Sequence, residues 1–352
     1  MKISIVGIGK LGLCAALIYE SKGYNVVGID INKNYIEQLN NKTFQSPEPY
    51  LNQLLQSSKN FLATDNLDLA FENDMIFLYI DTPTSEEGYD HSKLEKVLKL
   101  INQKKVSNKT LIIGSTCLPG FTNQAKKLLL DCSNTTLNYS PSFIAQGSIV
   151  TNYQNPDIVL IGSETEESGN LIKKSYESIV NNSPRYHIMN TLDAEITKIS
   201  LNCFITLKIS YANMIGDIAN KVGANREKIL NAISDDTRIG NKCIKWGWGY
   251  GGPCFPRDNC ALYKYADKVG IDAKLSKCSD QYNNYHAELM LEQYQLDSYD
   301  FGEVYYKEGI PIIENSQKLE VACRLAKLGK KIKIQDQYNL VKNKYGNIFE
   351  YY

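Results

Sequence analysis

The sequence predicts an α/β fold that begins with a doubly wound parallel sheet. Over the first 190 residues, short apolar runs rich in β-branched residues alternate with stretches of helical periodicity. The runs are continuous rather than alternating, which is typical of parallel strands buried on both faces. After residue 190 the pattern changes to long helical stretches, and a short mixed segment follows residue 290.

The elements follow from these patterns in chain order. Strands are expected at residues 2–7, 25–30, 75–80, 110–115, 136–139, 157–162 and 331–335. Helices are expected at 11–21, 34–39, 193–222, 272–294 and 319–328. We therefore predict three domains, at 1–190, 191–290 and 291–352. The last is a reduced α/β lobe, too small to form an independent core.

Composition excludes several classes of partner. Lys+Arg and Asp+Glu both number 39, so no basic surface is predicted for nucleic acid or an anionic membrane. No apolar run reaches the ~18 residues that span a bilayer, and Lys10 interrupts an apolar start that would otherwise suggest a signal peptide. Nine cysteines without a CxxC pair favour reduced thiols, so we expect a cytoplasmic protein with no metal site.

A glycine motif follows the first predicted strand. It consists of Gly7, Ile8, Gly9, Lys10, Leu11 and Gly12. In G-x-G-x-x-G the first glycine permits a tight turn, the second lets the backbone approach a pyrophosphate, and the third allows close helix packing. Asp30, at the end of the second strand, can bind ribose hydroxyls and favours NAD over NADP, a preference that Lys33 softens. We predict a Rossmann-type NAD site; a flavin dinucleotide, or a glycine turn without a ligand, are the alternatives.

A second motif contains a single cysteine. Residues 251–258 read GGPCFPRD, with Cys254 in a segment expected to be a loop stiffened by two prolines. Most free cysteines are small buried hydrophobes, and Cys14, Cys203 and Cys323 are interpreted that way. A cysteine nucleophile together with a hydride acceptor instead suggests oxidation through a thiohemiacetal and a thioester. The residues alone leave both interpretations of Cys254 open.

Several segments accompany this cysteine in a fixed order. DTRIG at 236–240 precedes GWGYGGPCFPRD at 247–258, and DTPT at 81–84, STCLPG at 115–120 and AEITKISLN at 194–202 come earlier. Together they resemble the UDP-glucose/GDP-mannose dehydrogenase family. The resemblance covers residues 1–285 well and the remainder poorly.

The resemblance implies a four-electron oxidation of the C6 alcohol of a nucleotide sugar to a carboxylate, with two NAD. Cys254 would attack the C6 aldehyde. Lys198 and Asn202, four residues apart on a predicted helix, would stabilise the oxyanion. Asp258 and Thr116 would position water or relay protons. For Lys198 and Asn202 the alternative is an ordinary solvated helix face.

Further contacts follow from the same resemblance. Besides the glycine motif, Asp30 and Lys33, cofactor contacts are expected from Thr82, Pro83, Ser115, Thr116, Gln146 and Arg257. Substrate contacts are expected from Ser142, Phe143, Ile144, Gln146, Lys198, Asn202, Arg238, Lys245, Gly249, Tyr250, Gly251, Tyr306 and Lys307. Arg238 resembles an arginine that reaches the sugar site of a neighbouring subunit. We therefore expect a homodimer formed by the helical domain, although its apolar stripes could equally build its own core.

The chain departs from the family pattern at two places. SPSFIAQG at 140–147 stands where the family has P-E-F-L-x-E, so Ser142 and Gln146 replace two glutamates. Gln146 cannot take a proton, which leaves thioester hydrolysis less supported than oxidation. ENS at 314–316 puts Glu314 where the family has a cofactor-facing arginine, and the C-terminal domain is expected to be shortened.

Three hypotheses remain after the sequence is read. The first is oxidation of UDP-glucose to UDP-glucuronate, which would supply uronic acid for a surface polysaccharide such as a capsule. The second is the same chemistry on another nucleotide-linked sugar or alcohol, which could stop before hydrolysis. The third is a catalytically weak NAD-binding regulatory protein. Fold alone does not decide between them.

Overall fold

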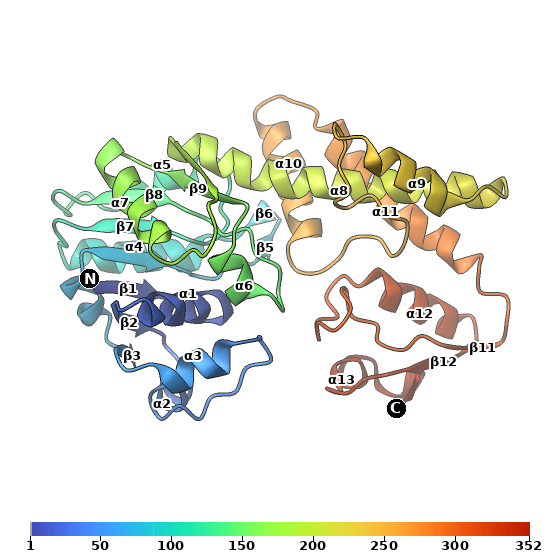
Figure 1. The fold of residues 1–352 in the computed structure, drawn as a ribbon, viewed down its shortest axis with the longest axis horizontal. Coiled ribbons are helices and arrows are strands. Elements are labelled where there is room, and N and C mark those ends of the chain that lie inside the picture. Colours follow the sequence, from blue (N-terminus) through green and yellow to red (C-terminus); the bar gives the residue numbers. More distant parts are fainter. Residues whose placement is uncertain (1, 87) are drawn as a thin grey trace. The chain divides into compact units, whose positions relative to one another are not determined.

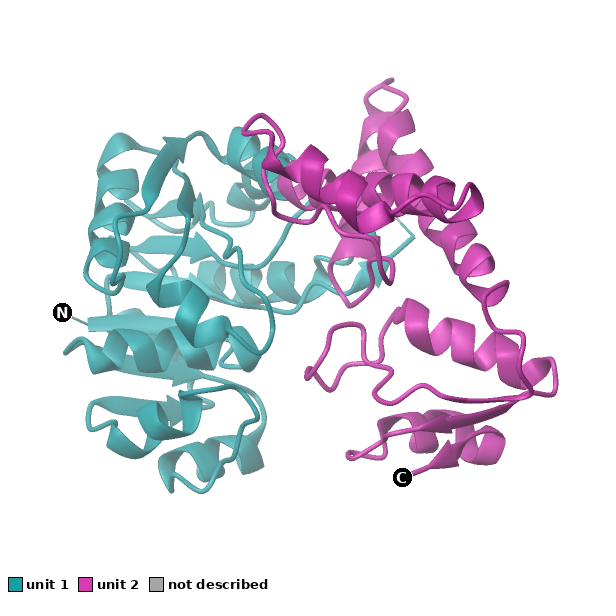
Figure 2. Cartoon of the chain, turned by 45° about the vertical axis from the view of Figure 1, so that its right-hand side comes forward, with its two compact units in different colours: residues 1–198 teal, residues 199–352 magenta. Residues whose placement is uncertain are grey.

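The computed structural model describes residues 2–86 and 88–352, which form two compact units. Unit 1 ends at Lys198 and unit 2 begins at Ile199 (Figure 2). The three-domain division, with boundaries after residues 190 and 290, stays a prediction.

Unit 1 is built around an eight-stranded sheet in the order β10-β9-β8-β7-β4-β1-β2-β3 (Figure 1). The strands are β1 Lys2–Val6, β2 Asn25–Ile29, β3 Phe61–Thr64, β4 Met75–Leu78, β7 Thr110–Ile113, β8 Thr136–Tyr139, β9 Ile158–Gly162 and β10 Arg185–Met189. In sheet order, the strands β8, β7, β4, β1, β2 and β3 are all parallel to one another. The chain runs outward from β1 to β3 and then crosses to β4, so the winding direction switches between β1 and β4. The predicted α/β class with a doubly wound sheet is confirmed.

Helices cover both faces of this sheet. One face packs against α1 Lys10–Ser21, α3 Leu51–Ser57, α6 Ile149–Gln154 and α7 Glu166–Glu177. The other face packs against α4 Ser92–Gln103 and α5 Phe121–Lys126. Successive side chains of a strand point to opposite faces. Phe77 therefore lies in one core, while Ile76 and Leu78 lie in the other.

The sheet differs from the prediction at one edge. β9 pairs with β8 in the antiparallel sense, and β10 runs parallel to β9, so the expectation of a wholly parallel sheet is wrong there. β10 was not predicted because it is a mostly exposed edge strand without an apolar run. β3 was also missed; it has four residues and only one is buried. Two further short strands, β5 Thr84–Ser85 and β6 Gly88–Tyr89, form an antiparallel pair.

Unit 2 combines long helices with a small sheet. α8 Thr191–Lys221 begins in unit 1 and is followed by α9 Arg226–Asp235, α10 Phe255–Lys268 and α11 Lys274–Leu291. β11 Ser298–Asp300, β12 Lys331–Ile334 and β13 Glu350–Tyr351 form a parallel sheet in the order β11-β12-β13. α12 Gln317–Lys327 shares a core with this sheet, and α13 Leu340–Tyr345 follows β12. The predicted helix at 319–328 and strand at 331–335 are confirmed.

Two structural absences concern the described part of the chain. Within residues 2–86 and 88–352, no helix combines the length and the apolar character needed to cross a membrane. Over the same residues, no three His, Cys, Asp or Glu side chains are grouped as a metal site would require.

The glycine motif explains how α1 is seated on β1. Gly7 has φ +90°, and a Cβ there would lie 2.3 Å from the carbonyl oxygen of Tyr79. A Cβ on Gly12 would lie 2.0 Å from the carbonyl oxygen of Gly7. Beside Gly9, by contrast, no heavy atom lies within 4 Å of the Cβ position. The first and third glycines are thus required by packing, whereas the second leaves open space at the start of the helix.

The surroundings of Gly12 and Gly9 predict different effects on stability and on NAD binding for two matched substitutions. Gly12→Ala is expected to lower the free energy of unfolding by roughly 1–3 kcal/mol, because backbone atoms must move. Gly9→Ala is expected to cost less than about 1 kcal/mol, while its affinity for NAD falls. Urea denaturation and NAD titration of both variants measure this. Equal destabilisation by the two substitutions would contradict the packing explanation.

His91 supplies a pH-dependent contribution to stability. Its ring stacks on Phe121 with centroids 4.0 Å apart, and its Nε2 accepts the Leu118 N–H at 3.2 Å. Burial lowers the pKa of His91 from 6.5 to about 4. The unfolded chain therefore binds the proton first as the pH falls, so this contribution is present above pH 6.5 and is lost towards pH 4. We expect the free energy of unfolding to fall by roughly 2–3 kcal/mol over this range through His91 alone.

The measurement is chemical denaturation as a function of pH. In His91→Phe the slope between pH 6.5 and 4 is expected to become shallower. His187→Gln, which changes an exposed histidine, is expected to leave it unchanged. An unaltered slope in His91→Phe would contradict the assignment.

Candidate functional site

The candidate site residues of unit 1 follow the carboxyl ends of its parallel strands. Gly7 follows β1, Asp30 follows β2, and Ser115 lies just beyond β7. Thr82 and Pro83 lie four and five residues beyond the end of β4, and the 140–147 segment begins directly after β8. In doubly wound sheets, ligands bind outside this edge near the switch in winding direction. The fold therefore collects these residues along one edge of the sheet.

The start of α1 is suited to an anionic group. Gly9 is its N-cap and no side chain caps it, so the backbone N–H groups of the first turn lack an acceptor from a cap. No acidic residue stands in that turn. Lys10 and Leu11 are exposed, whereas Ile8 is buried and its carbonyl oxygen accepts the Tyr35 hydroxyl at 2.8 Å. An uncapped helix N-terminus beside an open glycine matches the needs of a dinucleotide pyrophosphate.

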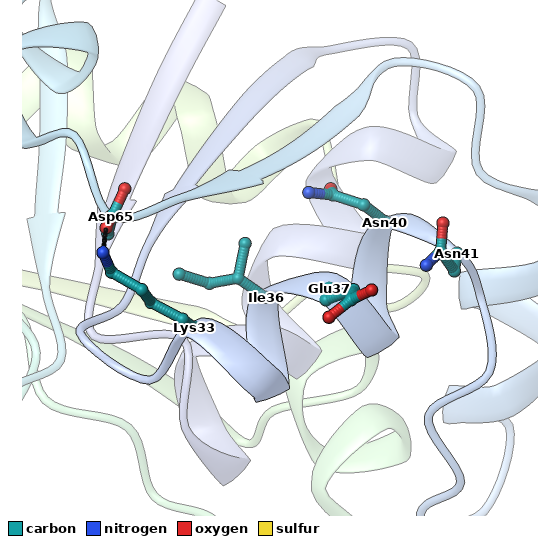
Figure 3. A pocket seen from close by; sticks show the side chains of 6 residues that line it. All are labelled: Lys33, Ile36, Glu37, Asn40, Asn41 and Asp65. Atoms are coloured by element: carbon teal, nitrogen blue, oxygen red, sulfur yellow. Dashed lines mark ion pairs between the residues drawn. The ribbon is translucent and has the colours of Figure 1, made fainter.

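The side chains of Asp30 and Lys33 have different partners. Asp30 is half-buried and accepts the backbone N–H of Asn32 at 3.0 Å. Lys33 begins α2 Lys33–Asn40 and pairs with Asp65 at 3.6 Å. This pair borders an open hollow of about 460 Å³ along α2, completed by Ile36, Glu37, Asn40 and Asn41 (Figure 3). The residues that line the hollow belong to α2, to Asn41 at its end and to Asp65, and none belongs to the glycine motif.

Two segments of the edge are tied together. The Thr82 hydroxyl donates to the carbonyl oxygen of Thr116 at 2.9 Å, and the Ser115 hydroxyl donates to that of Ile80. The fully buried carboxylate of Glu195 on α8 accepts the N–H groups of Gly120 and Thr122, at 2.6 and 2.7 Å. The 115–122 segment is therefore held from both ends.

The 140–147 segment contacts Lys198. The Lys198 ammonium donates to the carbonyl oxygen of Ser142 at 2.8 Å and lies 4.4 Å from the centre of the Phe143 ring. The Ser142 hydroxyl turns inward and donates to the Tyr153 hydroxyl at 2.8 Å. Behind this loop is a cavity of about 20 Å³, lined among others by Ile144, with room for about one water. Lys198 is thus a buried, oriented cation rather than part of a solvated face.

Gln146 is half-buried in the same segment. The residues after it are held by Glu48, whose carboxylate accepts the N–H groups of Gly147 and Ile149 at 2.9 and 2.6 Å. The backbone around Gln146 is therefore fixed by an acid distant in sequence.

In unit 2 only the first half of the cysteine motif, residues 251–254, forms the expected loop, because helix α10 begins at Phe255. Cys254 is the exposed N-cap of α10, and Asp258 belongs to the first turn of that helix. Pro256 is tolerated there because the first helical N–H groups have no intrahelical acceptor. The Asp258 carboxylate, buried to 1% exposure, accepts the Asn202 amide at 2.6 Å and the Arg257 Nε–H at 3.3 Å. Of the proposed catalytic residues, Asn202 and Asp258 are in direct contact.

The glycine-rich loop before Cys254 packs against the C-terminal lobe. A Cβ on Gly252 would lie 2.7 Å from the Tyr306 ring, and one on Gly251 would lie 2.1 Å from the carbonyl oxygen of Asn315. A Cβ on Gly249 would collide with Asn283 and Gln317 side-chain atoms. Burial raises the pKa of the Tyr306 hydroxyl, and the negative charge of a nearby Cys254 thiolate raises it further.

Other predicted contacts lie apart from these groups. Tyr250 is buried and its hydroxyl donates to Asp280, so its side chain packs inside unit 2. Arg238 is exposed and pairs with Asp236 of its own loop at 2.7 Å. Lys245 and Lys307 are exposed.

Sequence reasoning missed the residues that support the site. Tyr153, Glu48 and Asn283 contact site segments, yet each is an ordinary polar residue in a helical or loop pattern. Their partners lie at least 11 residues away in sequence, so no local motif marks them. The α10 helix carried a signal that could have been used, since a proline near a first turn and an acid two residues later are typical helix starts.

Comparison with known proteins adds to this geometry. Residues 1–180 match the NAD binding domain of the UDP-glucose/GDP-mannose dehydrogenase family, and residues 192–285 match its central domain. The expectation of an NAD-binding domain is thereby confirmed.

Curated relatives include two bacterial proteins named UDP-glucose 6-dehydrogenase. That of Rickettsia prowazekii is 31% identical over 291 residues, which are 79% of this chain and 65% of the relative. That of Bacillus subtilis is 28% identical over 305 residues, which are 83% of this chain and 68% of the relative. The chain thus spans slightly less than two thirds of the length of the Rickettsia prowazekii relative and slightly more than two thirds of the Bacillus subtilis relative.

Solved structures share the fold. A UDP-glucose dehydrogenase from Pyrobaculum islandicum superposes with a TM-score of 0.91 at 24% identity, over 100% of this chain and 85% of that one. A UDP-D-ManNAc dehydrogenase from Pyrococcus horikoshii gives a TM-score of 0.84 at 24% identity, over 96% and 84%. The two domain matches, in the order the motifs predict, establish that the chain belongs to the UDP-glucose/GDP-mannose dehydrogenase family.

Proposed function

We propose that the chain is an NAD-dependent nucleotide-sugar dehydrogenase that oxidises the C6 alcohol of UDP-glucose to the carboxylate. The observation that carries this proposal is Cys254, an exposed thiol at the N-terminus of α10 in a chain of this family. A helix N-terminus favours the thiolate, which is the nucleophilic form of cysteine.

The residues of unit 1 fit the cofactor. The open space beside Gly9 and the uncapped start of α1 suit a pyrophosphate, and Asp30 stands where a ribose hydroxyl would be bound. When bound, NAD accepts one hydride in each of the two oxidations.

The Cys254 thiol divides the oxidation into steps that balance. Loss of a hydride and a proton from the C6 alcohol gives an aldehyde. The Cys254 sulfur then bonds to the aldehyde carbon, and the carbonyl oxygen takes a proton to give a thiohemiacetal. Loss of a second hydride and the hydroxyl proton gives a thioester. Water attacks the thioester carbon, the C–S bond breaks, and the carboxylate and thiol are released.

The surrounding residues would stabilise charge and orient groups. Lys198, whose ammonium is held by Ser142, would stabilise the oxyanion, and Asn202 would assist by hydrogen bonding. Asp258, bonded to Asn202, and Thr116 would position water or relay protons. Arg238, an exposed arginine, would serve the sugar site of a neighbouring subunit.

A different nucleotide sugar is the second candidate. Gln146 favours it, because an amide replaces the acid expected beside the sugar. The solved structures of this fold also include proteins named for UDP-D-ManNAc and GDP-mannose. Purified protein should therefore be assayed with UDP-glucose, GDP-mannose and a UDP-N-acetylhexosamine. Absence of turnover with every nucleotide sugar would reject the class.

Stoichiometry and one substitution test the covalent route. We expect two NADH per UDP-glucose from the unmodified protein. Cys254→Ser is expected to lower kcat on the order of 10³-fold or more, because a hydroxyl is a much weaker nucleophile than a thiolate, with NAD affinity retained. Steady-state absorbance and NAD titration measure both effects.

A matched control is Cys278→Ser, which changes an exposed cysteine on α11 and should retain full activity. A single burst of two NADH per active site, with a trapped thioester, would contradict hydrolysis and point to Gln146, whereas one NADH per sugar with accumulating aldehyde would contradict the second oxidation. Undiminished turnover by Cys254→Ser would contradict the covalent route and leave the regulatory hypothesis.

We also propose a homodimer formed through α8. An exposed apolar stripe on this helix consists of Phe204, Tyr211 and Ile218, exposed by 62, 46 and 55%, and Val222, exposed by 72%, follows directly after the helix ends. Spacings of seven residues put the three helical side chains on one face. A stripe of this kind is typical of a helix that packs against another subunit, and a second copy of α8 offers the same stripe.

The dimer is tested by charging the stripe. Phe204→Lys combined with Tyr211→Lys is expected to convert a dimer into a monomer in light scattering at micromolar concentration, because buried unpaired charges oppose association. The control is Leu130→Lys, which charges an 84% exposed residue of unit 1. A monomeric unmodified protein would overturn the proposal.

The cytoplasm is the location we propose. No disulfide bond joins any of the nine cysteines, which lie in the described part of the chain. Reduced thiols are typical of the cytosol.

A further inference from the structure

Unit 2 contains a histidine that no part of the proposed reaction uses. His286 on α11 has 0% exposure. Its Nδ1 lies 2.7 Å from Oδ2 of Asp217 on α8, and its Nε2 lies 2.8 Å from the carbonyl oxygen of Gly247. A carbonyl oxygen can only accept a hydrogen bond, and so can a carboxylate. A neutral imidazole has one N–H and could satisfy only one of these partners.

Asp217 behaves as a carboxylate in this arrangement. Its oxygens accept the Trp246 Nε1–H and the Tyr282 hydroxyl, both at 2.8 Å, in addition to facing His286. Burial opposes ionisation of Asp217, but these hydrogen bonds outweigh burial and lower its pKa. The Trp246 and Tyr282 donors bind the ionised carboxylate more strongly than the neutral acid, so the geometry favours an imidazolium–carboxylate pair.

The other groups around the pair are few and identifiable. Tyr282 lies on α11 and Trp246 lies in the loop after α9. The Arg226 guanidinium, at the start of α9, stacks 3.6 Å from the Trp246 ring centre. A Cβ on Gly216 would lie 2.1 Å from Trp246, so this ring packs tightly on α8. The charge on Asp217 is thus faced by His286, with Arg226 beyond the indole.

Gly247 opens the loop that leads to Cys254. Neutral amide side chains also hold the loop, and the Asn315 amide donates to the carbonyl oxygen of Gly252 at 3.1 Å. The N–H groups of Gly247, Gly249 and Tyr250 donate to Asn213, Gln317 and Asn283 at 3.0, 2.6 and 3.0 Å. Unlike these amides, the imidazole of His286 can carry a positive charge. Hydrogen bonds from charged donors are roughly twice as strong as neutral ones.

We propose that His286, held as an imidazolium by Asp217, is a positioning residue that fixes Gly247 and with it the 247–252 loop before Cys254. The loop is rich in glycine and has few side chains with which to anchor itself, so its shape depends on partners from the helices. The consequence for substrate binding rests on the proposed function, whereas the protonation state and loop order do not.

The first test needs no substrate. The chain has three histidines, His91, His187 and His286, so a ¹⁵N-histidine spectrum is simple to assign by substitution. We expect one ring, absent in His286→Gln, to carry protons on both nitrogens in the folded protein. A neutral His286 ring in the unmodified protein would overturn the proposal, whether or not any variant folds.

The second test follows the loop itself. Hydrogen exchange of the peptide spanning 246–254 is expected to be about tenfold faster in His286→Gln and in Asp217→Asn. His187→Gln, which changes an exposed ring on unit 1, should leave it unchanged. Unchanged exchange in both Asp217→Asn and His286→Gln would overturn the positioning role.

The third test separates positioning from a general loss of structure. In Asp217→Asn the His286 ring loses its counter-charge, so KM for the nucleotide sugar is expected to rise about tenfold and to acquire a new pH dependence. The affinity for NAD should stay within about twofold. A KM with the same pH profile as the unmodified protein would contradict the pair. If no nucleotide sugar is turned over at all, the proposed function fails, while the spectrum and the exchange still decide the role of His286.

Discussion

A buried carboxylate must find hydrogen-bond donors, and this constraint fixes the segments on which the candidate site depends. In unit 1, Glu195 accepts two backbone N–H groups of the 120–122 turn, and Glu48 accepts two at 147–149. Each acid thus satisfies donors at the start of a short helix that could not satisfy them itself. In unit 2, Asp258 is bonded by amide and guanidinium side chains. Leaving any of these carboxylates without its donors costs several kcal/mol, so the surrounding chain has little freedom.

The same rule explains why the helices of unit 2 carry polar residues on buried faces. The 247–252 loop presents backbone groups without enough side chains to cover them. Asn283 and His286 lie three residues apart on α11 and so share a face that meets the loop, while Asn213 reaches it from α8. These polar residues on the helices are hydrogen-bond partners for the backbone of the 247–252 loop. The position of Cys254 is therefore set by polar contacts as much as by apolar packing.

The sequence could predict elements that have a local pattern of residues, but not contacts between residues far apart in the chain. The parallel strands and α1 were predictable because apolar runs and the glycine motif are local patterns. β10 could not be, since an exposed edge strand lacks an apolar run. The contact of Asn202 with Asp258 joins residues 56 positions apart, and the family resemblance supplied both residues but not their pairing. Asp217 and His286, 69 positions apart, carried no motif.

Ser142 and Gln146, the two residues that replace glutamates of the family pattern, have different surroundings in the structure. Ser142 lines a cavity of about 20 Å³; its hydroxyl donates to the Tyr153 hydroxyl, and its backbone carbonyl oxygen accepts the Lys198 ammonium. A carboxylate in that orientation would need far more room and would lose its hydration, at a cost of several kcal/mol. Serine at 142 therefore suits an interior position and need not alter the chemistry. Gln146 is half-buried on the same segment, and its amide can hydrogen-bond but cannot take a proton. In the proposed reaction, hydrolysis of the thioester thus concerns Gln146 rather than Ser142.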